Sequence, residues 1–495
     1  MNTNVMSMSK PYILAIDQGT SSTKAILFDD EGLVVKKATA HLKTDYMPNG
    51  FVEQDPQDIL NSVEAACTSC LDGVELHKID TIGISNQRET FVLWDKNGKS
   101  VYPAIVWACK RSTEICGTIK DQEAWLNEKT GLVVDPYFSG TKLLWIMQHQ
   151  PKIAARIKNG ELFFGTVDTW LLFNLTNGKS YFTDHSNASR TLFFNLKDLD
   201  WDQEILDKWE LGNLKLPAIK SSSDEFGETS LFGLLDNEVP ITSMIGDSHA
   251  SMFGETCFQI GETKMTLGTG SSLLMHVGNT PVKSAHGLLS TIGWSTKNEV
   301  AYAWEGAIVA CGSMVEWLRS MNIIETVEET EVMAKSVQEP SEVYLIPAFS
   351  GLGAPFWQMD RRASFHGLTF GTTASHIVKA TLEAICFQIK AVVDAMQKDL
   401  QQPIAQIAMH GGLSKNNFVQ QGLVSLIDAK INVQDNADIS AQGAAFLAGL
   451  QTGIFKDLEH IASLKSTQQV GDSKEKEQLT AKYEKWSALI NNTTE

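Results

Sequence analysis

The sequence predicts an α/β fold made of two related lobes, and three observations support this prediction. Short apolar segments with strand character alternate along the chain with helical stretches, which is typical of a sheet covered by helices on both faces. A hydroxyl-rich turn that contains glycine occurs twice between strands, about 250 residues apart. The chain of 495 residues is also long enough for two or three domains.

The first half begins with three expected strands, at 12–16, 24–28 and 33–36, joined by tight turns. Asp55 then provides a helix N-cap and Pro56 the first helical position. Ile59, Val63 and Ala66 form the apolar stripe of that helix. Further short buried strands are expected at 81–85, 92–94, 162–165 and 241–246.

The second half repeats this arrangement. Strands are expected at 263–266 and 273–277, and long helices at about 305–320 and about 373–399. The buried side of the second helix is expected to consist of Ile377, Ala380, Ala384, Phe387, Val392 and Met396. After residue 472, apolar side chains at helical spacing predict a C-terminal helix that docks by one face; they are Leu479, Tyr483, Trp486 and Ile490.

Composition and charge exclude several classes of protein. There are 59 acidic and 41 basic residues, and a net charge of −18 disfavours nucleic acid or an anionic membrane surface as a partner. The seven cysteines are scattered, which favours a reduced, cytoplasmic protein. Cys67 and Cys70 have redox-motif spacing, but they lie in a helical run where packing is the better interpretation. The N-terminal segment lacks an apolar leader and no run is long enough to cross a membrane, so no membrane insertion is expected.

The repeated turn is the most informative feature. It reads Asp17-Gln-Gly-Thr-Ser-Ser22 in the first half and Gly268-Thr-Gly-Ser-Ser272 in the second. Two such turns facing one another across a cleft would offer backbone N–H and hydroxyl donors to both sides of a polyphosphate. A single turn of this kind usually only connects strands, whereas the pair favours a nucleotide cleft. Neither turn has P-loop spacing.

Several longer motifs resemble the FGGY carbohydrate kinases. Residues 137–145 match the first signature of that family, and residues 365–368 with 376–383 match the second. Within the family, the glycerol kinases are the most similar, through residues 86–90, 104–107, 134–137, 165–170, 187–190 and 347–355. The resemblance implies a two-lobed actin/hexokinase/Hsp70-like (ribonuclease H-like) duplicated fold with the active-site cleft between lobes. The lobes would comprise residues 1–255, with the polyol and phosphate/Mg²⁺ site, and 256–495, with the nucleotide site.

The resemblance implies ATP-dependent phosphorylation of a terminal hydroxyl of glycerol, with Mg²⁺. Asp247 would be the catalytic base, and Asp17 would hold the metal ion, directly or through water. The alternative, purely structural roles are an Asx turn for Asp17 and helix capping for Asp247. The phosphate donors of the first lobe would be Thr20, Ser21, Ser22 and Lys24, the last standing where glycerol kinases usually carry Arg.

The implied polyol residues are Arg88, Glu89, Trp107, Tyr137, Asp247 and Ser248. Arg88 and Glu89 would offer a donor fork and an acceptor to substrate hydroxyls, the alternative being an exposed ion pair. Either aromatic residue, taken alone, would more often belong to a core. The implied nucleotide residues are Thr269, Gly312, Glu316, Gly412 and Asn416, with Glu316 replacing the usual Gln and His410 the usual Asp before the glycine loop.

Two departures concern the substrate. Ser248 and His249 stand where glycerol kinases usually have two glutamines, and Ser272 stands where an aromatic wall is usual. A larger and more polar pocket would suit an additional CHOH unit, so another small polyol or ketose (erythritol, threitol, a pentitol or xylulose) is the alternative substrate. The rival from another class is a non-enzymatic nucleotide switch, although it has no need of the polyol residues. A homodimer or homotetramer is implied by the resemblance alone.

Overall fold

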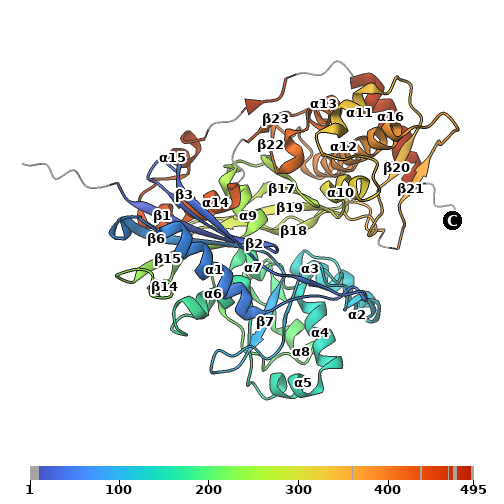
Figure 1. Cartoon of the computed structure of the whole chain (residues 1–495). Helices are drawn as coiled ribbons and strands as arrows, with labels where there is room; N and C mark the ends of the chain where they lie inside the picture. The colour runs from blue at the N-terminus through green and yellow to red at the C-terminus, as the bar shows by residue number, and fades with distance from the viewer. Residues whose placement is uncertain (1–9, 359, 435–437, 466–467, 472–475, 492–495) are drawn as a thin grey trace, which may run out of the picture.

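Two mixed β-sheets with the same strand arrangement form the frame of the protein (Figure 1). The computed structural model describes residues 10–358, 360–434, 438–465, 468–471 and 476–491. The first sheet has the order β14-β15-β6-β1-β2-β3 and the second β18-β19-β17-β16-β22-β23-β24. In each sheet a parallel triplet, β1-β6-β15 or β16-β22-β23, is flanked by antiparallel strands. The duplicated α/β fold predicted from the repeated turn is therefore confirmed.

The strands predicted at 12–16, 24–28, 33–36, 81–85, 241–246, 263–266 and 273–277 are confirmed with similar bounds, whereas β14, β18, β19, β22, β23 and β24 have no counterpart among the predicted strands. The first sheet consists of β1 (Tyr12–Gln18), β2 (Ser22–Phe28), β3 (Val34–His41), β6 (Ile79–Asn86), β14 (Ser223–Thr229) and β15 (Val239–Gly246). The second consists of β16 (Thr263–Leu267), β17 (Ser271–Gly278), β18 (Leu289–Ser295), β19 (Val300–Ile308), β22 (Gln406–His410), β23 (Lys430–Val433) and β24 (Gln468–Gln469).

Smaller sheets complete the strands. A five-stranded sheet has the order β4-β5-β8-β7-β9, with β4 (Asp45–Tyr46), β5 (Val52–Gln54), β7 (Phe91–Trp94), β8 (Ala104–Ile105) and β9 (Phe163–Thr166). The two-stranded sheets are β10 (Phe182–Asp184) with β13 (Ala218–Lys220), β11 (Phe194–Asn195) with β12 (Asp200–Trp201), and β20 (Tyr344–Ile346) with β21 (Ser364–His366).

Helices surround both sheets, and two of them lie between the sheets (Figure 1). Those of the first half are α1 (Pro56–Leu71), α2 (Thr113–Thr118), α3 (Glu123–Thr130), α4 (Ser139–His149), α5 (Pro151–Lys158), α6 (Val167–Leu175), α7 (His185–Ala188) and α8 (Gln203–Lys208). Between the sheets lie α9 (Asp247–Gly254) and α14 (Ile439–Thr452). The others are α10 (Gly312–Ser320), α11 (Glu329–Ser336), α12 (Ala374–Leu400), α13 (Asn417–Leu426), α15 (Leu458–Ser463) and α16 (Lys476–Asn491). No helix of the described residues combines the length and apolar character that crossing a bilayer requires.

One predicted helix is partly wrong. The helix expected at about 305–320 begins only at Gly312, because residues up to Ile308 form the end of β19. β19 pairs with both β17 and β18, and this pairing decides the conformation of a segment whose Ala, Trp and Glu residues are compatible with a helix. The helices predicted at 373–399 and after residue 472 are confirmed as α12 and α16.

Alternating side chains on β1 and β2 face two different layers of helices. Leu14 and Ile16 belong to the apolar cluster that includes α1, whereas Ile13 and Ala15 belong to the cluster that includes α14. Cys67 and Cys70 are buried in α1, where burial raises the pKa of each thiol, so the packing interpretation agrees with the structure and a redox role does not.

The central layer results from an exchange of helices between the two sheets. α9 follows β15 of the first sheet and packs against the second, while α14 follows β23 of the second sheet and packs against the first. The two helices touch through glycine. A Cβ atom on Gly443 would lie 1.9 Å from the carbonyl oxygen of Ala250, and one on Gly254 would lie 2.5 Å from that of Ile439. Because α9 carries Asp247 at its first position, this contact also positions the site described below.

The exchange predicts that Gly443→Ala destabilises the protein. The new methyl group must push α14 away from α9, and overpacking of this kind costs about 1–3 kcal/mol. The measurement is the midpoint of thermal unfolding, which should fall by several degrees. Gly117→Ala in α2 is the matched control, since a Cβ there meets no atom within 4 Å and alanine favours a helix. Equal stability of the two variants would contradict the close contact.

Candidate active site

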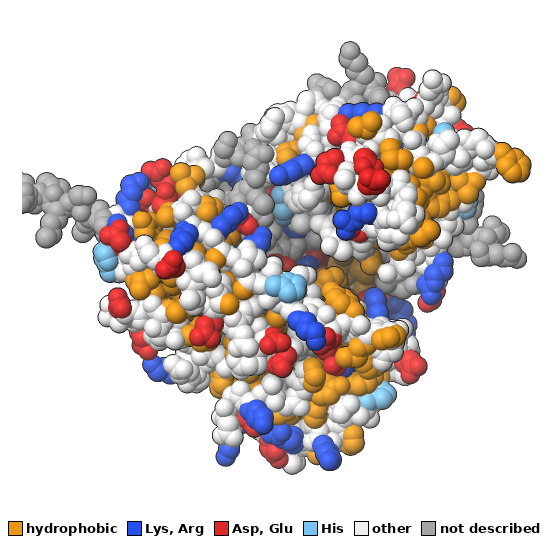
Figure 2. Space-filling model, in the orientation of Figure 1, with side chains coloured by type: hydrophobic (Ala, Val, Ile, Leu, Met, Phe, Trp, Pro, Cys, Tyr) orange, Lys and Arg blue, Asp and Glu red, His pale blue; other side chains and the backbone are white. Residues whose placement is uncertain are grey.

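The carboxyl ends of three parallel strands gather residues from distant parts of the sequence at one edge of the first sheet. Gln18 at the end of β1 lies beside Asn86 of β6, and Asn86 lies beside Gly246 of β15. Arg88 comes just after β6, and Asp247 directly after β15. The crevice beyond such strand ends is where ligands bind in open α/β sheets. Figure 2 shows the surface hollowed between the two large bodies of the molecule.

Asp17 lies at this edge next to other charges. It faces Lys24 on the neighbouring strand, and its Oδ1 accepts a hydrogen bond of 2.9 Å from the hydroxyl of Ser85. Burial raises the pKa of Asp17 to about 6; the Lys24 ammonium opposes this rise and the Asp247 carboxylate adds to it. Lys24 Nζ forms an ion pair of 2.8 Å with Asp438 at the start of α14. The carboxylates of Asp17 and Asp247 thus repel one another, and a cation bound near them would reduce this repulsion.

The hydroxyl turn of the first lobe is tighter than expected. Its backbone closes through a hydrogen bond of 2.9 Å from Gly19 N to the carbonyl of Ser22, which is already the first residue of β2. Ser21 is exposed, and Thr20 accepts a hydrogen bond of 2.9 Å from the indole N–H of Trp107. The turn is therefore attached to the aromatic residue that the sequence placed in the polyol site.

Arg88 is the centre of the predicted polyol residues. Its side chain is only 6% exposed; its Nη2 lies 2.9 Å from Glu305 Oε1 and 3.4 Å from the hydroxyl of Tyr137, and its Nε lies 3.4 Å from Asp247 Oδ1. The rings of Trp107 and Tyr137 meet edge to face, with centroids 5.8 Å apart. The side chain of Asp247 is 41% exposed. The structure thus brings Arg88, Trp107, Tyr137 and Asp247 together, with the carboxylate open to a ligand.

Glu89 is close to this group but is held by another arginine. Arg190 Nε lies 2.7 Å from its Oε1, and both side chains are buried, so the exposed ion pair considered for Arg88 and Glu89 is wrong. Burial outweighs the two guanidinium groups and raises the pKa of Glu89. The backbone of Glu89 has φ of 61°, a conformation that non-glycine residues seldom adopt and that is concentrated at functional sites.

Glu305 and Arg190 are site residues that sequence reasoning missed as such. Glu305 is fully buried on β19 and pairs with Arg88 and with Arg190, whose Nη1 lies 2.8 Å from its Oε2. Burial opposes the ionisation of Glu305, but the guanidinium groups of Arg190 and Arg88 outweigh it and hold its pKa well below the ordinary value. In the sequence, Glu305 is recognisable only as an acidic residue within the strongly apolar segment 300–308, part of which is predicted to be a helix.

Ser248 lies beside two further residues of the second sheet. Its hydroxyl is 3.0 Å from that of Ser272, which donates a hydrogen bond of 3.1 Å to Glu305. Lys264, which sequence reasoning also missed, donates to both serines. The helix-capping alternative for Asp247 does not describe the structure, because Gly246 is the N-cap of α9 and the Asp247 carboxylate accepts from the N–H of Ser248.

The hydroxyl turn of the second lobe lies against the start of α10. Thr269 is exposed at its tip, and its carbonyl accepts hydrogen bonds of 3.0 Å from the N–H groups of Cys311 and Ser313. A Cβ on Gly312 would lie 2.6 Å from the carbonyl oxygen of Gly268, so glycine is required there. The structure therefore places Thr269 and Gly312 side by side.

The remaining nucleotide candidates surround this turn less closely. Gly411, with φ of 105°, lies against the backbone of Leu267, so the loop with Gly412 approaches the end of β16. Asn416 caps α13, accepting a hydrogen bond from its backbone and donating one to a threonine of α11. Glu316 forms an ion pair with the arginine three residues later on α10. These contacts give Asn416 and Glu316 structural partners of their own.

The chain is similar to known carbohydrate kinases. Residues 12–254 match the profile of the N-terminal domain of the FGGY family of carbohydrate kinases, and residues 263–452 match that of its C-terminal domain. The chain is 43% identical over 460 residues to a glycerol kinase of Alkaliphilus metalliredigens, covering 92% of each chain. It is 41% identical over 493 residues to a glycerol kinase of Oceanobacillus iheyensis, covering 98% of this chain and 99% of the relative.

Solved structures show the same architecture. A glycerol kinase of Plasmodium falciparum, crystallised with ADP, matches with a TM-score of 0.90 and 34% identity over 98% of this chain and 99% of that chain. A gluconate kinase of Lactobacillus acidophilus matches with a TM-score of 0.89 at 22% identity, covering 98% of both chains, and this second likeness concerns the fold alone.

The environment of Asp17 predicts that Asp17→Asn stabilises the folded chain above about pH 6. The carboxyl group is then ionised in both states, and keeping that charge buried costs about 1–3 kcal/mol, an amount that the neutral amide avoids. Below about pH 4 the group is protonated in both states, so the gain should vanish. Unfolding curves at pH 7.5 and pH 4, with the exposed Asp198→Asn as control, measure this difference. An Asp17→Asn variant less stable than the parent at pH 7.5 would contradict it.

Proposed function

The chain belongs to the FGGY family of carbohydrate kinases, and on this premise we propose that it transfers the γ-phosphoryl group of ATP to a terminal hydroxyl of glycerol, giving glycerol 3-phosphate and ADP. The observation that carries this proposal is the position of Asp247. Its half-exposed carboxylate lies beside Arg88, at the edge of the sheet that also holds Asp17 and the first hydroxyl turn.

Asp247 acts as the general base in this proposal. Its carboxylate accepts the proton of the attacking hydroxyl, which raises the nucleophilicity of that oxygen toward phosphorus. Arg88 and Tyr137 donate hydrogen bonds to the polyol, Glu89 accepts, and Trp107 provides an apolar wall for the carbon chain. Because Glu305 and Arg190 hold Arg88 and Glu89, the polyol meets groups that are already oriented.

Mg²⁺ would be held by Asp17, whose pKa is raised mainly by burial and further by the Asp247 carboxylate, although the Lys24 ammonium opposes this rise. The described residues contain no cluster of three or more metal-ligating side chains, and a single carboxylate suits a Mg²⁺ ion that is coordinated mainly by phosphate and water. When bound, the ion supplies charge neutralisation to the phosphates. Thr20, Ser21, Ser22 and Thr269 offer hydroxyl donors, and Lys24 adds a cation that it shares with Asp438.

The nucleotide would bind beside the second turn. Gly412, where a Cβ would meet no atom within 4 Å, would allow backbone to approach it closely, Gly312 would lie beside it at the start of α10, and Glu316 and Asn416 would border the adenosine. Closure of the lobes would exclude water that otherwise hydrolyses ATP. The buried, free thiols support a reducing, cytoplasmic location. For the inferred homodimer or homotetramer, the exposed apolar side chains of Leu368 and Phe370 offer a contact surface.

A second candidate substrate is a longer polyol or a small ketose. The observation that favours it is the pair of hydroxyls on Ser248 and Ser272, 3.0 Å apart and connected to Lys264 and Glu305. Such a polar wall would bind a hydroxyl beyond the third carbon at little cost.

Asp247→Asn tests the role of the base. The amide has the size of the carboxylate but accepts no proton, so glycerol-dependent release of ADP should fall at least about 100-fold, while ATP binding and the unfolding midpoint stay close to those of the parent. The measurement is kcat in a coupled ADP assay, with Asp198→Asn as the matched control. A variant that keeps more than a few per cent of the parental kcat would remove Asp247 from this role. Absence of any polyol stimulation over basal ATP hydrolysis in the parent would favour the nucleotide switch.

A further inference from the structure

Lys264 is a buried cation without an assigned role. It lies on β16 and is 0% exposed, and among the described residues its ammonium group forms no ion pair. Instead it donates hydrogen bonds to three hydroxyl groups: Ser248 Oγ, Thr266 Oγ1 at 3.0 Å and Ser272 Oγ at 3.4 Å. The three N–H donors of the ammonium group are therefore all used by neutral acceptors. An arrangement of this kind orients hydroxyls rather than neutralising a charge.

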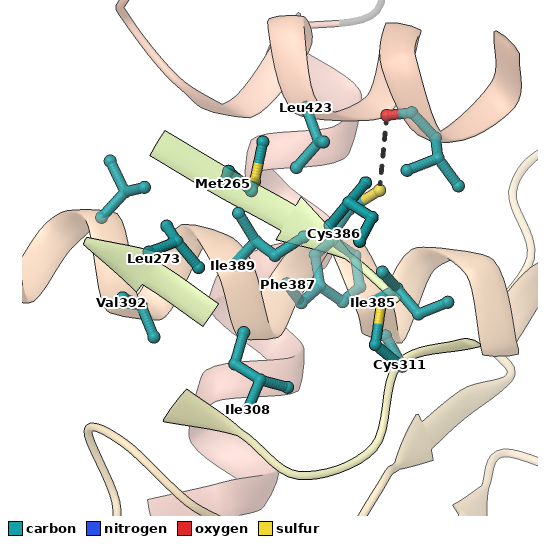
Figure 3. Close-up of a cluster of buried hydrophobic side chains, with 14 of the residues drawn as sticks. Met265, Leu273, Ile308, Cys311, Ile385, Cys386, Phe387, Ile389, Val392 and Leu423 are labelled. Atoms are coloured by element: carbon teal, nitrogen blue, oxygen red, sulfur yellow. Dashed lines mark hydrogen bonds between the residues drawn. The ribbon is translucent and has the colours of Figure 1, made fainter. Parts of the chain in front are cut away.

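The pattern of the second sheet explains why these groups meet. Side chains alternate along β16, so Lys264 and Thr266 share one face, and Thr266 lies directly beside Ser272 of β17 and His410 of β22. The opposite face is apolar: Figure 3 shows Met265 and Leu273 among the side chains of α12. A polar row thus crosses three strands on the face that is turned toward α9.

The polar row continues to both parts of the proposed site. In one direction Ser272 donates to Glu305, which holds Arg88. In the other direction Thr266 Oγ1 lies 2.9 Å from His410 Nε2, and His410 comes directly before the Gly411–Gly412 loop.

The far side of His410 fixes the direction of this chain of hydrogen bonds. Its Nδ1 lies 3.0 Å from the carboxylate of Glu255, which also binds Lys465. Because the carboxylate is an acceptor, Nδ1 carries the proton and Nε2 accepts from the Thr266 hydroxyl. The lone pairs of that hydroxyl then face the ammonium of Lys264.

Building on the proposed function, we propose that Lys264 is a positioning residue: it orients the hydroxyls of Ser248 and Ser272 beside Asp247 and, through Thr266 and His410, fixes this wall of the polyol site relative to the Gly411–Gly412 loop. Because the Ser248 oxygen accepts from the ammonium, its O–H is directed to another acceptor, the neighbouring serine or a substrate hydroxyl. Polyol recognition thereby depends on a residue that itself need not touch the substrate.

The cost of placing a cation here supports a functional role. Burial lowers the pKa of Lys264 to about 7, with the nearby Arg88 guanidinium adding to this effect and the carboxylates of Glu305 and Asp247 opposing it. An apolar side chain of similar length would therefore be easier to bury than the ammonium group. This contrast separates a positioning role from a merely structural one.

Lys264→Met tests the proposal directly. The unfolding midpoint is expected to stay unchanged or to rise. The KM for glycerol is expected to rise about tenfold, because oriented hydrogen bonds on the polyol side are lost, while the KM for MgATP should change less than about twofold. A Lys264→Met variant with parental KM for glycerol would overturn the proposal. So would a variant whose two KM values change equally as its unfolding midpoint falls, since that pattern indicates a structural lysine.

Thr266→Val provides an independent variant that keeps the ammonium group. It removes the two hydrogen bonds of the Thr266 hydroxyl, one to Lys264 and one to His410, but leaves the bonds of Lys264 to Ser248 and Ser272. A smaller rise in the KM for glycerol is therefore expected. Thr263→Val on the same strand is the matched control, because its hydroxyl bonds to the carbonyl of Gly261 and takes no part in the polar row. Equal KM values for Thr266→Val and Thr263→Val would overturn the connection to His410. If the parent shows no glycerol-dependent ADP release, the proposed function itself is overturned. If the parent is active and Lys264→Met has the parental KM for glycerol, only the positioning role of Lys264 is overturned.

Discussion

The buried ion pair between Arg88 and Glu305 is the interaction on which the site depends. Arg88 follows a strand of the first sheet, and Glu305 belongs to a strand of the second, so the pair connects the two halves of the molecule at the candidate active site. Arg190 joins Glu305 to Glu89 and extends the pair into a network of buried charges. Each member compensates another, and removal of one partner from such a network costs about 3–5 kcal/mol because a buried charge is left alone.

This constraint explains why Arg88, a proposed polyol residue, is held in place while the carboxylate of Asp247, the proposed base, remains accessible. Arg88 is held by Glu305 and keeps its Nε beside the half-exposed carboxylate of Asp247. Asp247 in turn begins α9, whose contact with α14 is close enough to require glycine at both Gly254 and Gly443. The proposed base is thus carried by the helix whose packing joins the two sheets. Duplication of the fold and placement of the site follow from the same central layer.

The sequence predicted the parts of the site that are encoded locally. Thr20 and Thr269 belong to short turns whose composition is informative by itself, Asp17 lies near the end of a buried strand just before the first of these turns, and Asp247 directly follows another buried strand. Glu305 and Lys264 could not be predicted in the same way. Each is a charged residue within a strand, Glu305 in an apolar segment and Lys264 in one that also contains polar residues, and its meaning appears only when strand pairing places it beside partners far away in the chain.

Tertiary pairing also caused the one wrong element. The segment ending at Ile308 has a composition that suits a helix, but two neighbouring strands satisfy its backbone as β19. Because the segment was predicted to be a helix, Glu305 was not recognised as a site residue. An acidic residue is common at the start of a helix, whereas one in a buried strand requires a charged or polar partner. The missed residue and the misassigned element therefore have the same cause.

The values of kcat/KM for ATP-dependent phosphorylation across a series of acceptors would show whether the proposed site between the two lobes is built for glycerol. Glycerol would be compared with erythritol, threitol, xylitol, ribitol, dihydroxyacetone and xylulose in one coupled ADP assay. The account predicts that glycerol has the highest value. A series led by a four- or five-carbon compound would contradict it and would assign the polar wall of Ser248 and Ser272 to the additional carbon.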